Sequence, residues 1–353
     1  MSSGKPPGFG RPLFLHFATV QAPMPTALIT PEALYEQAGP HVDRLVGAGF
    51  EVKYPEDSTF TRGRSPEETI AGLEGIDAIL AGGERLTAEV MEGCPGLRVI
   101  ARCGVGFDRV DIPAATRLGR VVTITPTANH AAVAEQALAL LFGVSKRVAI
   151  HDKLVRSGGW STEPMRPIRG QTMGIFGLGR IGRSMAVRCA SLGMTVIATE
   201  KYPDEAFCSE QGIELVDFDT LLSRSDAISI HCPLNDETHG LFNADVLSKM
   251  KPDSVLINTA RGGMIVESDL LNALQNGPLA AAGLDVFEQE PATADNPLFA
   301  LDNIVVSPHL AGADTTSIQD MANEAADCIA TLYEGNWPGP AVINPDVQAS
   351  WSW

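Results

Sequence analysis

The stretch Thr172-Met173-Gly174-Ile175-Phe176-Gly177-Leu178-Gly179-Arg180-Ile181-Gly182 decides the fold. Its first five residues predict a buried strand, and its last six follow the pattern Gly-x-Gly-x-x-Gly. Gly177 allows a sharp turn, Gly179 lets a pyrophosphate approach the backbone, and Gly182 lets the next helix pack closely on the sheet. The N–H groups of Arg180 and Ile181 would face the pyrophosphate at the helix start. The glycine pattern alone is a weak signal, but the strand before it predicts a dinucleotide site.

An acidic residue occupies the position that, in a dinucleotide-binding domain, contacts the ribose hydroxyls and distinguishes NAD from NADP. The next predicted strand, 195–199, ends at Glu200, about 20 residues beyond the glycines. A carboxylate there accepts hydrogen bonds from ribose hydroxyls and repels a 2′-phosphate, so Glu200 favours NAD. Alternatively, Glu200 is a solvated loop residue, and Lys201 beside it would soften the discrimination.

Strands and helices alternate along the whole chain, which is typical of parallel sheets. We expect strands at 26–30, 76–80 and 97–101 and one that starts at 49–52, in a first unit that ends near 121–124. Further strands are expected at 172–176, 195–199, 227–231, 254–258, 282–286 and 304–307. A helical pattern runs from Leu34 to Val46, with Gly47 and Gly49 near its end. The pattern predicts an α/β protein of two doubly wound parallel-sheet domains. We expect a Rossmann NAD-binding domain, residues 124–313, to be inserted into a flavodoxin-like substrate-binding domain, residues 1–123 completed by 314–353.

Two helical stretches have apolar faces that need a partner. The longest, 128–147, is apolar on most sides and predicts either a link between domains or an interface with a second subunit, so we expect a homodimer. The stretch 315–333 carries an apolar stripe and is expected to return to the first domain.

Composition argues against several partners. The formal net charge is −17, so nucleic acid and anionic membrane surfaces would be repelled, and a small anionic substrate needs local cations. The six cysteines show no Cys-x-x-Cys pair and no metal-type clustering with histidine, which predicts reduced thiols, no metal site and a cytoplasmic protein.

Met1 to Gly10 lacks the layout of a signal peptide, and the Gly/Pro-rich leader that precedes Thr26 is expected to be loosely ordered.

From about Thr26 to Asn344 the chain resembles the D-2-hydroxyacid dehydrogenase family, which includes phosphoglycerate, glycerate and formate dehydrogenases. The most specific segments are Ala101–Asp111, the glycine pattern, Asn258–Gly263, Gly283–Pro291 and Ser307-Pro308-His309. The resemblance implies hydride transfer between NAD and a small anionic 2-hydroxy or 2-keto acid, with Arg261, Glu290 and His309 as the catalytic set. Beyond the glycine loop and Glu200, it implies cofactor contacts at Cys232, Pro233, Thr238, Thr259, Arg261, Asp285 and His309. It implies substrate contacts at Gly82, Gly83, Val105, Gly106, Arg261 and His309.

The chemistry explains these residue types. Reduction of a 2-keto acid places negative charge and then a proton on the carbonyl oxygen, and His309 is suited to supply that proton. Glu290 would orient the imidazole and favour its protonated form. Arg261 offers a rigid fork of donors for the substrate carboxylate.

Each of these residues also has a plain structural interpretation. Arg261 could be a surface ion-pair partner, Glu290 a turn residue and His309 a loop histidine. Asp285 could contact the nicotinamide carboxamide, as the resemblance implies, or stabilise a turn. We expect no nucleophilic role for Cys103, because hydride transfer needs none.

The chain departs from the family pattern in three places. Phosphoglycerate dehydrogenases usually carry a basic residue after the third strand, whereas Ala81-Gly82-Gly83-Glu84 stands here, which weakens the case for a phosphorylated substrate. Asp314 takes a position where threonine is common. The chain ends at Trp353, so we expect no appended regulatory domain, and Trp351 and Trp353 need a pocket or partner to cover them. The sequence does not identify the acid, and an NAD(H)-responsive corepressor-like binding protein is the alternative function.

Overall fold

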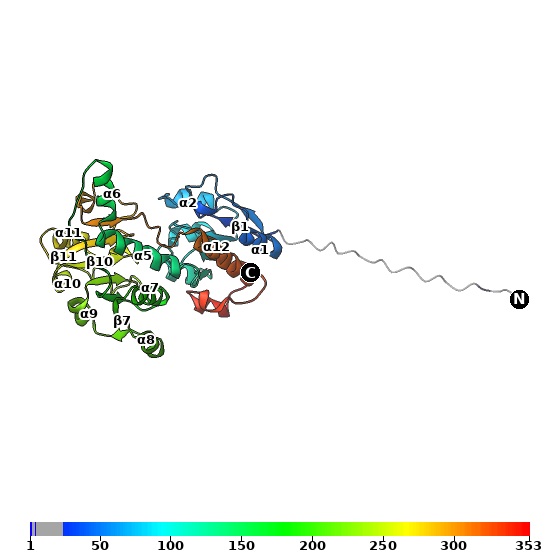
Figure 1. Ribbon diagram of the computed structural model, residues 1–353. Coiled ribbons are helices and arrows are strands. Elements are labelled where there is room, and N and C mark those ends of the chain that lie inside the picture. Colours follow the sequence, from blue (N-terminus) through cyan, green and yellow to red (C-terminus); the bar gives the residue numbers. More distant parts are fainter. Residues whose placement is uncertain (2–3, 5–23) are drawn as a thin grey trace.

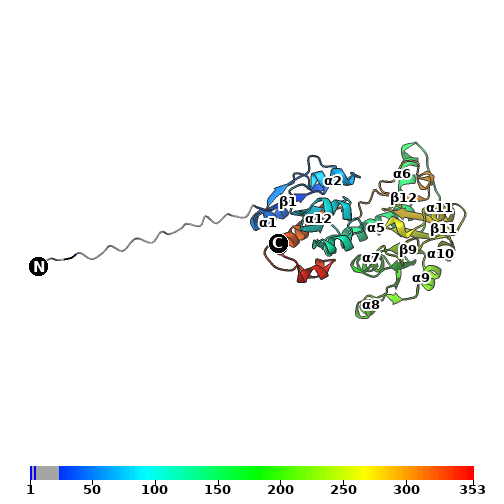
Figure 2. The same ribbon diagram turned by 180° about the vertical axis from the view of Figure 1, so that it is seen from behind.

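The computed structural model describes Met1, Gly4 and residues 24–353. The expectation of a loosely ordered leader therefore falls largely outside the described residues. Two α/β domains lie side by side, each built on its own parallel sheet (Figures 1 and 2). This arrangement confirms the predicted fold class.

The first domain holds a five-stranded sheet with the order β2-β1-β3-β4-β5, the flavodoxin order. Its strands are β1 (Thr26–Ile29), β2 (Glu51–Lys53), β3 (Ala78–Ala81), β4 (Val99–Arg102) and β5 (Val121–Thr123). Its helices are α1 (Pro40–Ala48), α2 (Pro66–Gly72), α3 (Ala88–Gly93) and α4 (Ile112–Arg117). The strands β1, β3, β4 and β5 are buried along their whole length, as expected where helices cover both faces of a parallel sheet.

The second domain holds a seven-stranded sheet with the order β12-β11-β10-β9-β6-β7-β8. Its strands are β6 (Thr172–Phe176), β7 (Thr195–Thr199), β8 (Glu214–Leu215), β9 (Ala227–Ile230), β10 (Ser254–Asn258), β11 (Leu279–Leu284) and β12 (Ile304–Val306). Its helices are α5 (His130–Ser145), α7 (Arg180–Ser191), α8 (Glu205–Gln211), α9 (Phe218–Arg224), α10 (Ala244–Ser248) and α11 (Glu267–Gln275). The strand order reverses between β6 and β9, which is the point where doubly wound sheets bind ligands.

Two elements differ from the sequence-based expectation. The edge strand β8 is exposed and two residues long, too short to produce a periodic pattern. The helix expected from Leu34 to Val46 is instead a short 3-10 turn at Glu32–Leu34 followed by α1. Pro40 starts α1, since its ring fits the first helical turn, and Gly49 ends it in the left-handed region at φ 104°.

Helix α12 (Thr315–Tyr333) returns to the first domain, where it packs against α1. Asp314 caps it, because its Oδ1 accepts a hydrogen bond from the N–H of Ser317 at 2.6 Å, and this explains the aspartate at that position. Trp353 packs edge-to-face against Phe50 and Tyr333, so the first domain itself partly covers the C-terminal tryptophan.

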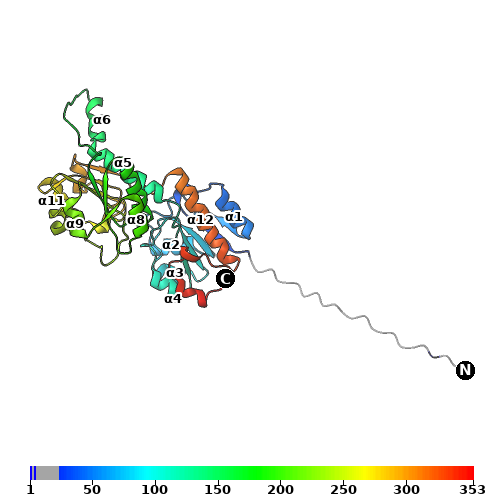
Figure 3. The ribbon, with the colours of Figure 1, turned by 60° about the horizontal axis from the view of Figure 1, so that its bottom comes forward.

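Helix α5 lies against α7 and the β10–β12 side of the second sheet, so the described residues of its own domain cover much of its apolar surface. The following helix α6 (Val148–Arg156) projects from the body of the domain and has no buried residue (Figure 3). Among the described residues, no helix combines the length and the apolar character needed to cross a membrane.

Candidate active site

Three neighbouring strands end at the same edge of the second sheet. Asn258 of β10 pairs with Leu284 of β11, which pairs with Val306 of β12. Because these parallel strands end in register, the loops that follow them carry Arg261, Glu290 and His309 to one place. All three side chains border the cavities between the two domains.

His309 and Glu290 form a hydrogen-bonded pair. Nδ1 of His309 lies 2.7 Å from Oε2 of Glu290, while Oε1 of Glu290 accepts from the N–H of Phe287 at 3.2 Å. Burial raises the pKa of Glu290, but the hydrogen bond and charge of His309 outweigh it and hold the pKa below its ordinary value. His309 has a left-handed backbone, at φ 54°, which is rare for a residue with a side chain. With Nδ1 engaged, Nε2 is the ring nitrogen left for a substrate.

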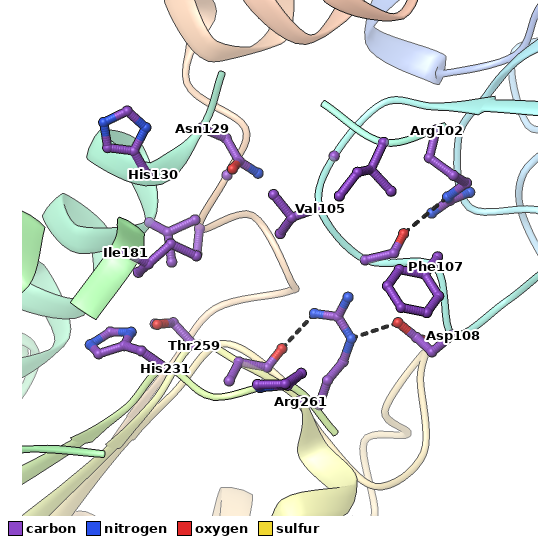
Figure 4. Close-up of a pocket in the computed structure, with 18 of the residues that line it drawn as sticks. Arg102, Val105, Phe107, Asp108, Asn129, His130, Ile181, His231, Thr259 and Arg261 are labelled. Carbon is purple, nitrogen blue, oxygen red and sulfur yellow. Dashed lines mark hydrogen bonds and ion pairs between the residues drawn. The ribbon is translucent and has the colours of Figure 1, made fainter. Parts of the chain in front are cut away.

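Arg261 lies across the cavity that separates the domains (Figure 4). Its Nε donates to Oδ1 of Asp108 at 2.8 Å, and its Nη1 donates to the carbonyl of Ala260 at 2.6 Å. Nη2 lies against Gly106, where a Cβ atom would overlap it. The guanidinium is therefore fixed on two sides and approaches a backbone that only glycine leaves open.

The predicted substrate loops of the first domain face this cavity and a second one. Val105 and Gly106 line the first cavity, of about 560 Å³, while Gly82 and Gly83 line a second, of about 820 Å³. Buried Arg102 joins the two loops, because it donates to the carbonyl oxygens of both Gly82 and Gly106.

The glycine loop has the shape that the sequence predicts. Gly177 has φ 95°, and a Cβ on it would lie 2.6 Å from the N atom of Cys232. Gly182 faces the carbonyl of Gly177 so closely that a Cβ would overlap it, whereas Gly179 faces open space. Helix α7 starts at Arg180, so free N–H groups and the positive helix end point toward that space.

Unpartnered polar atoms mark the cofactor side of the first cavity. Oγ1 of Thr259, Nδ1 of His231 and Oδ1 of Asn129 are buried and have no hydrogen-bond partner within the described part of the chain. Buried polar atoms normally find partners, so these atoms fit a polar ligand such as a dinucleotide. Burial lowers the pKa of His231 to about 3, so its ring is neutral.

Most of the remaining residues that we predicted to contact the cofactor line the first cavity, and one makes its contacts within a nearby loop. Arg180, Ile181, Cys232 and Pro233 line the first cavity. Thr238 instead turns toward its own loop, where its hydroxyl donates to the carbonyl of Pro233 at 2.8 Å. The hydroxyl of Thr238 is thus engaged within its own loop, and a contact of this residue with the cofactor stays a prediction.

Glu200 follows β7 and reaches back to the glycine loop. Its two carboxylate oxygens accept hydrogen bonds from the N–H groups of Leu178 and Tyr202, at 2.7 and 3.0 Å. Lys201 forms an ion pair with Glu237 at 2.9 Å. The carboxylate is thus held beside the glycine loop, and the neighbouring cation is engaged elsewhere.

Asp285 is fully buried and organises the loop that carries His309. Its oxygens accept from the hydroxyl of Ser307 and from the N–H groups of Leu310 and Ala311, at 2.5, 3.0 and 2.8 Å. These contacts correspond to the turn-stabilising interpretation. For Cys103, burial raises the thiol pKa well above its ordinary value, so the group is a poor nucleophile.

Several residues at the site were not singled out from the sequence. The second cavity is lined by five arginines, at 62, 64, 85, 102 and 109, although no basic residue stands directly after β3. These cations come from separate segments, so a search of one loop does not find them. Asp108 and Arg109 stood within the Ala101–Asp111 motif, which was the available signal. Among the described residues, no group of three or more His, Cys, Asp or Glu side chains could hold a metal ion.

Comparison with known proteins defines the class. Residues 138–311 match the family model described as "D-isomer specific 2-hydroxyacid dehydrogenase, NAD binding domain". The chain is 40% identical to a glyoxylate reductase of Thermofilum pendens over 294 residues, which cover 80% of this chain and 86% of that protein. The chain belongs to the D-isomer-specific 2-hydroxyacid dehydrogenase family, and its second domain is the NAD-binding domain.

Two further relatives support this assignment. A D-3-phosphoglycerate dehydrogenase of Mycobacterium leprae is 42% identical over 287 residues, which cover 80% of this chain and 54% of that protein. The chain therefore spans little more than half of the length of that relative. The crystal structure of the TT0316 protein from Thermus thermophilus superposes with a TM-score of 0.80 at 34% identity, covering 90% of this chain and 99% of that one.

Proposed function

We propose that the protein is an NAD-dependent oxidoreductase that interconverts a D-2-hydroxy acid and its 2-keto acid. The observation that carries this proposal is the meeting of a hydrogen-bonded His309–Glu290 pair with Arg261 beside the cofactor loops. Family membership supports the reaction class, since relatives are named as glyoxylate reductase and D-3-phosphoglycerate dehydrogenase. Because those relatives are enzymes, the corepressor-like alternative is not favoured.

His309 acts as the proton donor in reduction. When bound, the nicotinamide supplies a hydride to the carbonyl carbon of the keto acid, or accepts it back from the hydroxy acid. The carbonyl oxygen then gains negative charge, and Nε2 of His309 gives it a proton. Glu290 keeps the ring oriented and stabilises its protonated form, because its own carboxylate stays ionised at neutral pH.

Arg261 binds the substrate carboxylate. Two of its nitrogens are held by Asp108 and Ala260, so the third, Nη2, is presented next to Gly106 at little further cost in side-chain entropy. The N–H groups of Val105 and Gly106 would complete an anion nest on the opposite side. Together these groups hold the reacting carbon near His309.

The cofactor residues favour NAD over NADP. The Glu200 carboxylate lies at the glycine loop, where a 2′-phosphate would meet its negative charge. Arg180, Ile181, Cys232, Pro233 and Thr259 provide the other contacts in this proposal, and Thr238 acts by holding the loop. The NAD-binding domain would span 124–313, and the substrate-binding domain would combine 1–123 with 314–353.

Two properties of the whole protein are further proposals. The projecting segment after α5 exposes Val148, Val155, Trp160 and Met165, and Trp160 is 83% exposed, so we propose that this segment meets a second copy in a homodimer. All six cysteines are free thiols, which supports a cytoplasmic location.

A substrate panel tests the function. The purified chain is mixed with NADH or NADPH and, in turn, glyoxylate, hydroxypyruvate, pyruvate and phosphohydroxypyruvate, and loss of cofactor absorbance is followed. We expect oxidation of NADH with at least one keto acid and slower oxidation of NADPH. Binding of NADH without oxidation by any acid would contradict the enzymatic proposal and support the binding-protein alternative.

A further inference from the structure

Two adjacent residues of opposite charge reach from the first domain to the candidate catalytic residues of the second. Asp108 accepts a hydrogen bond from Nε of Arg261 at 2.8 Å. Arg109 places its Nη2 3.7 Å from Oε2 of Glu290 and donates through Nη1 to the carbonyl of Gly83 at 2.6 Å. One short segment thus contacts two members of the catalytic set, and each contact pairs opposite charges.

The segment is anchored firmly enough to act as a fixed reference. It follows β4, and Arg102 at the end of that strand donates to the carbonyl of Gly106 at 3.2 Å. The N–H of Leu86 donates to the carbonyl of Arg109 at 2.9 Å, which joins this loop to the one after β3. These bonds tie the loop that carries Asp108 and Arg109 to the backbone of the first domain.

The contact with Glu290 involves the same oxygen that binds His309. Oε2 accepts from Nδ1 of His309 at 2.7 Å and faces Arg109 at 3.7 Å, and the Glu290 and Arg109 side chains are only 20% and 30% exposed. Solvent screens such a pair less than it screens a surface ion pair. The imidazolium of His309 and the guanidinium of Arg109 share one carboxylate oxygen, so Arg109 competes with protonated His309 for the negative charge of Glu290.

Other charged groups surround this pair. The second cavity, beside the pair, is also lined by four arginines and one buried glutamate: Arg62, Arg64, Arg85, Arg102 and Glu84. Asp108 and Arg261 line the first cavity. Buried Asp285 lies beneath the loop of His309. Among the described residues, Arg109 and His309 are the cationic side chains whose N atoms lie within 4 Å of a Glu290 oxygen. Removal of the Arg109 charge therefore acts on the His309–Glu290 pair directly.

We propose that Asp108 and Arg109, in the first domain, are positioning residues that align Arg261 and the His309–Glu290 pair of the second domain. This inference rests on the proposed function. Asp108 sets the direction in which Arg261 presents Nη2, so it governs substrate binding. Arg109 sets the pH range in which the His309–Glu290 pair holds its proton, so it governs the pH profile of turnover.

The test uses Asp108→Ala, Arg109→Gln and Arg109→Lys in the full chain. The matched control is Arg117→Gln, which removes an exposed ion pair with Glu92 in the same domain. We expect Asp108→Ala to raise the KM for the keto acid about tenfold or more, the loss expected for one hydrogen bond to a charged group. We expect Arg109→Gln to move the alkaline limb of the reduction profile upward by about half a pH unit or more, and Arg109→Lys to restore it in part.

Hydrogen exchange provides a readout that does not need activity. In Asp108→Ala, peptides that cover 104–111 and 258–264 should exchange faster than in the unmodified chain, and Arg117→Gln should leave them unchanged. Unchanged exchange, or an unchanged KM and pH profile in an active enzyme, overturns the inference. If none of the keto acids tested supports oxidation of NADH by the unmodified chain, the proposed function fails. Hydrogen exchange would still decide whether Asp108 holds Arg261.

Discussion

Gly106 and Arg261 fit together only because residue 106 has no side chain: a Cβ there would overlap Nη2 of the guanidinium. We predict that Gly106→Ala displaces the nitrogen that we assign to the substrate carboxylate. The KM for the keto acid should rise about tenfold or more while NADH affinity changes little. Steady-state kinetics and NADH fluorescence titration measure the two quantities.

A matched control for this change is Gly47→Ala, because a Cβ at residue 47 meets nothing within 4 Å and the position lies in helix α1. It should leave KM unchanged and affect stability only slightly, in the favourable direction for a helix. An equal rise of KM in both variants would show that the effect of Gly106→Ala is general.

The proposed roles of His309 and Arg261 predict that their replacement lowers catalytic activity without a matching loss of NADH affinity. His309→Ala should lower kcat by about 10² to 10⁴, the range typical of a general acid, and Arg261→Ala should lower kcat/KM by a similar factor. Both variants should bind NADH nearly as well as the unmodified chain, because the glycine loop is untouched. Near-normal turnover by either variant on the best keto acid would remove that residue from the mechanism.

The sequence predicted the strands of the fold better than it predicted the contacts that join the two domains at the candidate site. Buried runs such as 172–176 and 254–258 identify their strands because residues shielded on both faces are apolar. The sequence also placed Arg261, Glu290 and His309 after strands, and the structure brings them together at one edge. The contact between Arg109 and Glu290 depends on how the two domains sit together, and no periodicity within one domain reports that.

The Glu290 carboxylate predicts a specific pH dependence. Burial raises its pKa, but His309, the N–H of Phe287 and Arg109 lower it more, so the pKa lies below the ordinary value of 4.5. A depressed carboxylate pKa means that the charge which stabilises protonated His309 is present at neutral pH and is lost only as the pH falls through that lower value. Glu290→Gln should therefore move the alkaline limb of the reduction profile downward, by about one pH unit or more. The pH profile of kcat/KM measures this, and an unchanged limb would separate Glu290 from the proton transfer.

Cofactor choice gives a further prediction at Glu200. Replacement by Ser removes the charge that opposes a 2′-phosphate, so the preference for NADH over NADPH should fall by about tenfold or more. Lys201→Gln is the matched neighbour, because Lys201 is paired with Glu237 and should have little influence. The ratio of kcat/KM for the two cofactors is measured for each variant, and a ratio that Glu200→Ser leaves unchanged would place cofactor selection elsewhere.

Buried Asp285 should matter for stability as well as for catalysis. Asp285→Ala leaves the hydroxyl of Ser307 and the N–H groups of Leu310 and Ala311 without their acceptor. An unsatisfied donor costs about 1–3 kcal/mol where it is buried, as the N–H of Ala311 is. We expect the midpoint of urea unfolding to fall and kcat to fall with it, because the loop that holds His309 loses its internal support. Asp285→Asn keeps one acceptor oxygen and should be intermediate in both measurements. If Asp285→Ala unfolded like the unmodified chain but bound NADH weakly, the carboxylate would serve the cofactor rather than the turn.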